Sequence, residues 1–175
     1  MRGSGLAAIA LLLAGTASCG GPALTYEAGL RVTARDAYRE ARLQALSWDG
    51  DAYLRFIEGE SISPDGFADP TGGGYWRFSF DRPRDNEQLV VSIAPADDAS
   101  RTRPRQSPPG YAVGNNRLGT EWIDSPRAAE TARAANLPAD EPISMLLVPT
   151  TPAQWILSAG DGRWRVNATT GALIE

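Results

Sequence analysis

The side chains of this chain that could do chemistry are one thiol, a set of carboxylates and several serines, and histidine is absent. Without an imidazole, a Ser-His or Cys-His triad and a histidine-ligated zinc site are excluded. All 17 basic residues are arginine, which also excludes a Schiff-base lysine and the lysine of a phosphate-binding P-loop. Carboxylates are therefore the remaining acid and base candidates, and a carboxylate glycosidase is the enzyme class to consider.

Most acids stand in turns or on polar helix faces, where no pattern opposes two of them across a cleft. Asp49, Asp51, Asp65 and Asp69 suggest calcium, but they lack the alternating ligands, central glycine and closing glutamate of an EF-hand loop. Ser125 has neither a histidine nor nucleophile-elbow glycines beside it, so we expect it to cap a helix. The sequence thus predicts a noncatalytic protein with no metal and no cofactor.

The single cysteine, Cys19, has the surroundings of a lipidation site. Arg2 and the apolar run 6–14 resemble an export signal, and the run is shorter than the about 20 residues that a membrane span needs. Residues 16–18, Thr-Ala-Ser, then resemble the lipobox of bacterial lipoproteins, with Thr16 standing where an aliphatic residue is usual. The resemblance implies cleavage before Cys19 and a diacylglycerol on its sulfur, an anchor to which each buried methylene contributes about 0.8 kcal/mol.

An ordinary secretory leader cut nearby is the alternative, and Cys19 would then be lost or left as an unpaired thiol. A lipidated chain would lie in the bacterial cell envelope, on the periplasmic side of the outer membrane where the cell has one, because Gly20 rather than aspartate follows the cysteine. No second cysteine is present, so the core must hold the fold. The net charge of −4 argues against a nucleic-acid partner.

Composition divides the chain into five segments. Residues 1–18 are the expected signal peptide and residues 19–30 a lipidated tether. A first α+β half is expected at 31–96 and a second at 121–175. Between them, 97–120 is rich in proline and arginine and is expected to be a linker or long loop.

Each half is predicted to pair an amphipathic helix with antiparallel strands. Thr33 and Asp36 form a capping-box pair ahead of an alanine stripe, and Ser125 with Pro126 starts the second helix. Residues 53–57 are a strand or a short helix, and 59–74 are expected to form a loop. Further strands are expected at 75–80, 89–93, 143–148, 153–158, 163–168 and 172–174.

The two halves repeat one order of elements, an alanine-rich helix followed by a tryptophan-led strand, a turn and another strand. Trp76 corresponds to Trp155, and residues 91–93 correspond to 164–166. The expected fold class is therefore α+β, built from two tandem helix-plus-antiparallel-sheet units. The two sheets could join edge to edge, or the helices could pack together.

The C-terminal stretch WILSAGDGRWRVNATTGALIE resembles the closing signature of PepSY-type domains, through Trp155, Val166, Ala168, Thr170 and Gly171. The family often has aspartate where this chain has Asn167, and the first half lacks the Thr-Gly turn. The resemblance implies a small cystatin-like module of the bacterial envelope that binds or restrains peptidases or other envelope partners without catalytic residues.

We therefore expect a lipid-anchored envelope protein that binds a protein or peptide, with peptidase regulation as one role. Its anchor to the membrane would be Cys19. The candidate partner surface consists of arginines and tryptophans, namely Arg101, Arg103, Arg105, Trp155 and Trp164, and the arginines could also touch anionic headgroups or cell-wall polymer. A structural or assembly lipoprotein of an envelope complex is the alternative, and it would carry a large apolar interface.

Overall fold

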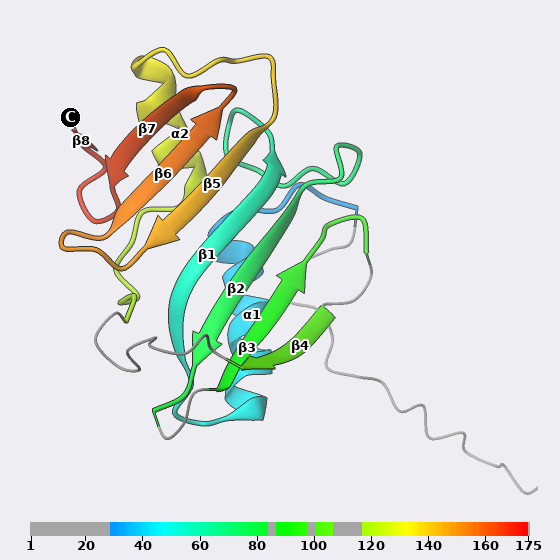
Figure 1. The fold of residues 1–175 in the computed structure, drawn as a ribbon. Coiled ribbons are helices and arrows are strands. Elements are labelled where there is room, and N and C mark those ends of the chain that lie inside the picture. The colour runs from blue at the N-terminus through cyan, green and yellow to red at the C-terminus, as the bar shows by residue number, and fades with distance from the viewer. Residues whose placement is uncertain (1–28, 84–86, 98–100, 107–116, 175) are drawn as a thin grey trace, which may run out of the picture.

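The computed structural model describes residues 29–83, 87–97, 101–106 and 117–174, which form one eight-stranded antiparallel sheet and two helices (Figure 1). In chain order the elements are α1 (Ala34–Trp48), β1 (Tyr53–Ile62), β2 (Tyr75–Asp81), β3 (Glu87–Ile93), β4 (Arg101–Gln106), α2 (Ser125–Ala134), β5 (Ile143–Val148), β6 (Gln154–Ala159), β7 (Gly162–Asn167) and β8 (Leu173–Ile174). The α+β class predicted from the sequence is confirmed.

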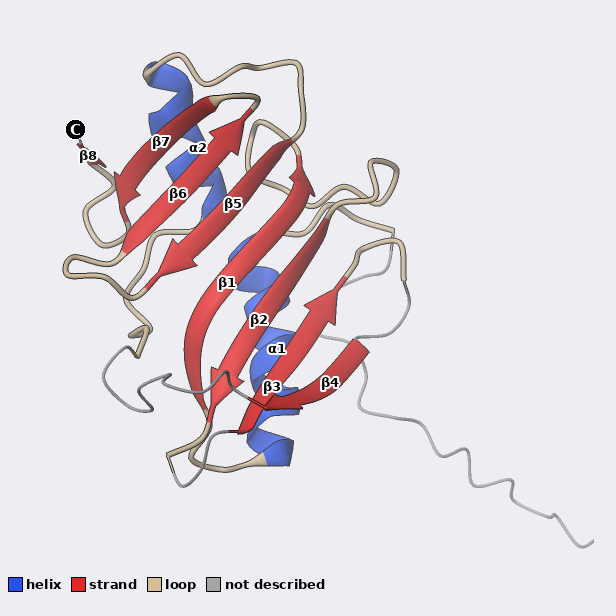
Figure 2. Cartoon of the chain, in the orientation of Figure 1, coloured by secondary structure: helices blue, strands red, loops and turns tan. Residues whose placement is uncertain are grey.

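The sheet has the strand order β4-β3-β2-β1-β5-β6-β7-β8. Each helix is thus followed by four strands, and the two sets of strands meet where β1 pairs with β5, with Ile57 opposite Leu147. This pairing joins the sets edge to edge and removes two exposed sheet edges. Both helices lie on the same face, α1 against β1–β3 and α2 against β6 and β7 (Figure 2).

The core lies between the helices and this face of the sheet. The stripe of α1 that faces the strands is alanine, with Ala37, Ala41 and Ala45 fully buried, as the sequence predicts. Small side chains let the helix approach the sheet closely, and aromatic rings from the strands, including Phe78 and Phe80, fill the space. α2 repeats this pattern with its own alanines over the second set of strands.

Two tryptophans occupy equivalent places in the two sets of strands. Trp76 on β2 and Trp155 on β6 are both fully buried on the core face. The indole N–H of Trp76 donates to the carbonyl of Val32 at 3.0 Å, and that of Trp155 donates to the carbonyl of Ile123 at 2.9 Å. Each acceptor directly precedes the N-cap residue of a helix. The correspondence of the two tryptophans, predicted from the sequence, is therefore present in three dimensions.

The start of the second helix differs from the prediction. Asp124 is its N-cap, which moves Ser125 to the first helical position. Ser125 is fully buried, and its Oγ accepts from the backbone N–H of Ala34 in α1 at 3.0 Å. The Asp124 carboxylate accepts from the N–H of both Arg35 and Ser125, at 3.0 and 2.7 Å. The N-termini of the two helices therefore meet, and a single carboxylate serves both.

Replacing Asp124 with alanine is expected to lower the free energy of unfolding by about 2 kcal/mol, because N–H groups at two helix N-termini lose their acceptor. Thr33 caps α1 alone, through the N–H of Asp36. Thr33→Ala is therefore the matched control, with an expected cost of about 1 kcal/mol. Urea unfolding followed by circular dichroism measures both. Equal costs for the two variants would contradict the shared cap.

The predicted loop at 59–74 begins too early. Residues 53–57 are a strand, and β1 continues through Gly59 to Ile62. A Cβ at Gly59 would lie 2.4 Å from the Trp76 ring, so this glycine makes room for the indole. A glycine that signals a turn and one that admits a ring are indistinguishable in sequence.

A strand also forms within the expected linker of residues 97–120. Arg101–Gln106 is β4, the outermost strand, and it pairs antiparallel with β3 so that Val90 lies opposite Arg103. An edge strand tolerates Pro104, because only one of its sides needs backbone N–H donors. The prediction of a linker depended on the prolines of this segment. A proline destabilises a central strand but is tolerated in an edge strand, and the sequence does not show which strand lies at the edge.

Candidate partner-binding face

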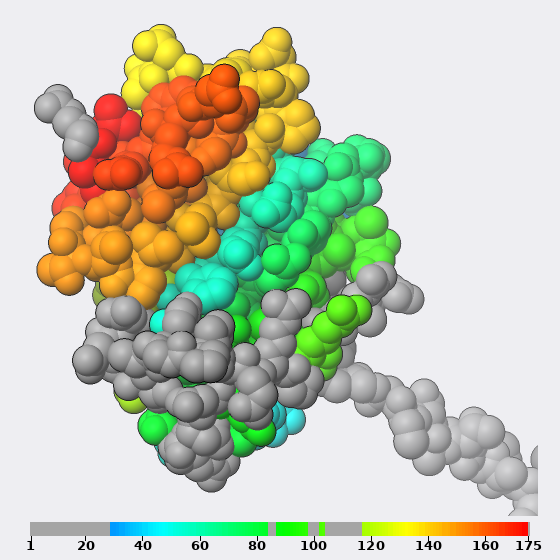
Figure 3. Space-filling view, viewed as in Figure 1, coloured from blue at the N-terminus to red at the C-terminus, as the bar shows by residue number. Residues whose placement is uncertain are grey.

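The sheet face opposite the helices, here called the open face, faces the viewer in Figure 1 and in the space-filling view of Figure 3. Because side chains alternate along a strand, every residue that points away from the core belongs to this face. Half-buried or exposed side chains on it include Glu58, Tyr75, Arg77, Ser92, Arg103, Leu146, Ile156, Ser158, Arg163 and Arg165. No helix within the described part of the chain covers them.

The first set of strands forms a shallow depression of about 250 Å³ on the open face. Its lining includes Tyr75 and Arg77 from β2 and Arg103 from β4. Arg77 is held in place, because it donates to the Tyr75 hydroxyl at 2.9 Å and pairs with Glu58 at 3.3 Å. The charge of this arginine is therefore partly compensated inside the protein.

The second set of strands carries a different surface. Leu146 and Ile156 lie half-buried side by side on β5 and β6, and Arg165 is the next residue across the sheet. Arg163 lines both a depression of about 280 Å³ beside β1 and another of about 290 Å³ beside β8. Both arginines are exposed, and neither forms an ion pair with any described residue.

The arginines of the predicted partner surface lie on β4. Arg103 is exposed and lines the first depression. The backbone of Arg101 and Arg105 belongs to the same strand, but their side chains lie outside the described residues, as does Cys19.

The tryptophans of the predicted partner surface lie on the opposite side of the sheet. Trp155 is fully buried in the core, so its assignment to a partner surface is wrong. Trp164 is half-buried, and its indole N–H donates to the carbonyl of Ala135 beside α2 at 2.8 Å. Both residues stand at the positions of their strands that face the helices.

Arg163 and Arg165 were missed, although the segment GRWRVN contains the signal. Alternation along a strand puts these two arginines on one face and Trp164 on the other. Interpreting that alternation requires knowing which face is covered, and this depends on the helices.

Two carboxylates on this face, Glu58 and Glu60, line the depression beside β1, and each has a polar partner. Glu58 pairs with Arg77, and Glu60 accepts from the Ser144 hydroxyl at 3.3 Å. No group of three or more His, Cys, Asp or Glu that could hold a metal ion occurs in the part of the chain that the structure describes.

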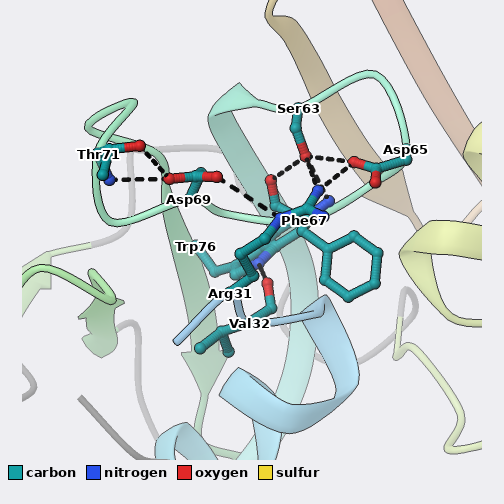
Figure 4. A network of polar contacts seen from close by, with 8 residues as sticks. All are labelled: Arg31, Val32, Ser63, Asp65, Phe67, Asp69, Thr71 and Trp76. Atoms are coloured by element: carbon teal, nitrogen blue, oxygen red, sulfur yellow. Dashed lines mark hydrogen bonds and ion pairs between the residues drawn. The ribbon is translucent and has the colours of Figure 1, made fainter. Parts of the chain in front are cut away.

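Two of the aspartates that suggested calcium bind Arg31 instead (Figure 4). Arg31, three residues before the first residue of α1, donates to Asp65, and its Nε lies 3.5 Å from Asp69 Oδ2. The Ser63 hydroxyl donates to Asp65 at 2.6 Å and accepts from Arg31 at 2.9 Å. The Arg31 guanidinium also stacks over the Phe67 ring, 4.4 Å from its centroid. This network attaches the start of the fold to the loop between β1 and β2.

Burial acts to raise the pKa of Asp65, but hydrogen bonds from Ser63 and Arg31 and the Arg31 charge outweigh it, so the pKa lies below its ordinary value of 3.8. A depressed folded-state pKa means that the ionised carboxylate stabilises the fold above pH 3.8. This stabilisation is lost as the pH falls through the lower folded value.

Asp65→Asn is therefore expected to be less stable than the wild type at neutral pH and to match it more closely in acid. Urea unfolding between pH 7 and pH 2 would show the difference in unfolding free energy shrinking below about pH 4. Arg31→Gln should show the same trend, since it removes the charge that Asp65 contacts. A difference that stays constant with pH would contradict the ionic origin.

Comparison of the chain with protein-family models, with curated proteins and with solved structures returns no match. Among the described residues, neither helix has the length and apolar character needed to cross a membrane.

Proposed function

We propose that this chain is a noncatalytic, lipid-anchored protein of the bacterial cell envelope that binds a protein or peptide partner through the open face of its sheet. The observation that carries the proposal is the placement of both helices on one face of an eight-stranded sheet. The other face keeps half-buried apolar side chains next to exposed arginines, which is typical of a surface that a partner covers. Restraint of a peptidase is one role that such binding would serve.

The turn near the C-terminus supports the proposal that the two units are PepSY-like and cystatin-like. Asn167 Oδ1 accepts from the backbone N–H groups of Thr169 and Thr170, both at 2.9 Å. A carboxylate would accept these bonds equally well, so asparagine can stand where the family pattern often has aspartate. Gly171 has a φ of +77°, a conformation that favours glycine.

The surface favours reversible binding over permanent assembly. A subunit of a stable complex usually exposes a contiguous apolar patch when isolated. Within the described residues, the large apolar side chains that are exposed are Leu30, Leu43, Leu46 and Leu173. Leu43 and Leu46 are one turn apart on α1, whereas Leu173 lies on β8, so they do not form one patch.

The anchor is tested by the intact mass and detergent partitioning of the full chain expressed in a bacterial host. The wild type is expected to carry acyl chains and to enter the detergent phase, and Cys19→Ala is expected to lose both properties. An unlipidated product cut near Cys19 would overturn the anchor and leave an exported, diffusible binder.

The binding face is tested by placing a photo-cross-linking amino acid at Ser158 on the open face. The same amino acid at Arg127, exposed on α2, is the matched control. Irradiation of intact cells is expected to yield one defined adduct from position 158 and none from position 127. Equal adducts from both positions, or none from position 158, would contradict the proposal.

A further inference from the structure

We infer that the open face of β5–β8 binds an acidic polypeptide segment in extended conformation, in which an apolar residue follows a carboxylate two positions later. The inference rests on the proposed function and names the chemistry of the partner. It depends on the charge, the apolar surface and the strand spacing of this part of the sheet.

The charge of this surface is opposite to that of the whole chain. The protein has a net charge of −4, yet strands β5–β8 contain two arginines and no acid. Arg163 and Arg165 are exposed and form no ion pair with a described residue, so their charges are available to a partner. Arginine is suited to this role, because its planar guanidinium binds carboxylates in a bidentate manner.

Acids mark the limits of the surface. Glu58 and Glu60 line the depression on its β1 side, where Glu58 stands opposite Leu146 and pairs with Arg77. Asp161 stands in the turn between β6 and β7. An anionic ligand is therefore repelled at these borders and attracted between them, which limits its carboxylates to the region of β7.

Apolar side chains lie on both sides of Arg165. The strand register aligns Leu146, Ile156, Arg165 and Ile174 in one row across the sheet. Leu146, Ile156 and Ile174 are each half-buried, so a ligand could remove further apolar area from water. A purely charged ligand would leave this apolar area uncovered.

The distances between side chains in this row determine how far apart the carboxylate and the apolar residue of the ligand must lie. Neighbouring strands lie about 4.8 Å apart, so Ile156 and Leu146 are about 5 and 10 Å from Arg165 along the row. In an extended segment, residues two apart lie about 7 Å apart and point to the same side. Consider a segment that runs across the strands from β7 toward β5, with a carboxylate over Arg163 and Arg165. The residue two positions after that carboxylate then lies over Ile156 and Leu146.

The test uses the full chain, purified from its host, and the fluorescently labelled peptide ESLSESLSE, with binding measured by fluorescence anisotropy. The double variant Arg163→Gln/Arg165→Gln is expected to weaken binding about tenfold. The matched control is Arg127→Gln/Arg133→Gln, which removes two exposed charges from α2 on the other side of the sheet. This control is expected to bind the peptide within about twofold of the wild type, since neither residue lies on the open face.

Two further peptides separate the sources of binding. RSLSRSLSR reverses the charge and is expected not to bind. ESSSESSSE keeps the charge and loses the apolar residues, and it is expected to bind more weakly than ESLSESLSE. Equal binding of both acidic peptides would overturn the inference, since the surface would then recognise any anionic polymer. Equal loss in the two double variants would overturn it as well, because it would show attraction by net charge alone.

The inference and the proposed function fail in different ways. If ESLSESLSE does not bind but position 158 still cross-links to one partner, the acidic segment is overturned and the binding face stands. If the peptide binds through Arg163 and Arg165 but no adduct forms in cells, the peptide site stands and the envelope role falls.

Discussion

Replacing Asp81 with alanine is expected to lower the free energy of unfolding by about 3–5 kcal/mol, because the buried Arg55 charge loses its carboxylate. Arg55 Nη1 lies 2.5 Å from Asp81 Oδ2, and the two side chains are 8% and 3% exposed. Gln88 donates to the other oxygen of the same carboxylate at 3.2 Å. Such a pair is costly to break because the remaining charge cannot be solvated where it lies.

Chemical denaturation of the wild type and Asp81→Ala measures this loss. The matched control is Glu130→Ala, which breaks a pair with Arg127 in which both side chains are 60% exposed. That change is expected to cost less than about 1 kcal/mol, because water screens the pair. The double variant Arg55→Met/Asp81→Leu should be more stable than Asp81→Ala, since neither charge of the pair remains. Equal costs for Asp81→Ala and Glu130→Ala would contradict burial of the Arg55 pair.

Replacing Trp76 with alanine is expected to cost about 3–5 kcal/mol, and Trp155→Ala is expected to cost a similar amount. Both indoles are fully buried, and their rings contact edge to face with centroids 6.3 Å apart. Each substitution leaves a cavity beneath a helix N-terminus and removes the hydrogen bond to the residue that precedes the N-cap. The similar cost is a consequence of the equivalent places of the two residues.

The variants Trp76→Phe and Trp155→Phe separate the stability lost to the cavity from the stability lost with the indole hydrogen bond. A phenyl ring fills much of the space but removes the indole donor to the carbonyl of Val32 or Ile123, and the net loss of one hydrogen bond costs about 0.5–1.5 kcal/mol. The Val32 carbonyl still accepts from the backbone N–H of Ala68 at 2.9 Å. Both phenylalanine variants should therefore fall between the wild type and the alanine variants. If Trp155→Ala costs less than half as much as Trp76→Ala, the two positions are not energetically equivalent.

Features that depend on neighbours in the chain could be predicted from the sequence. The Thr33–Asp36 cap and the alanine stripe of α1 are confirmed, because caps and periodicities act within a few residues. The alternation predicted for residues 75–80 appears in the burial of residues 75–78, whereas Ser79 is buried like Phe78 and Phe80. The correspondence between Trp76 and Trp155 was visible for the same reason, since each tryptophan begins a strand with a similar local pattern. Local pattern was sufficient for the α+β class.

Features that depend on distant residues required the tertiary structure. By sequence Gly59 is typical of a turn, but in the structure it makes room for the Trp76 ring. Ser125 is typical of an N-cap, but in the structure its hydroxyl accepts from the Ala34 N–H of the other helix. Trp155 was assigned to a surface because a strand pattern identifies two faces but does not say which one the helices cover.

The candidate site was predicted least well, for this same reason. The alternating arginines of residues 101–105 predict Arg103 as part of the partner surface. In the segment GRWRVN the prediction selects Trp164 and leaves out Arg163 and Arg165. By itself the sequence determined two helices, most of the strands and their alternation, because these follow from interactions within a few residues. The tertiary structure decided that β1 joins β5 and that both helices lie on one side, because pairing and packing join residues far apart in the chain. Those two choices leave one face of the sheet open and turn Arg163 and Arg165 toward it.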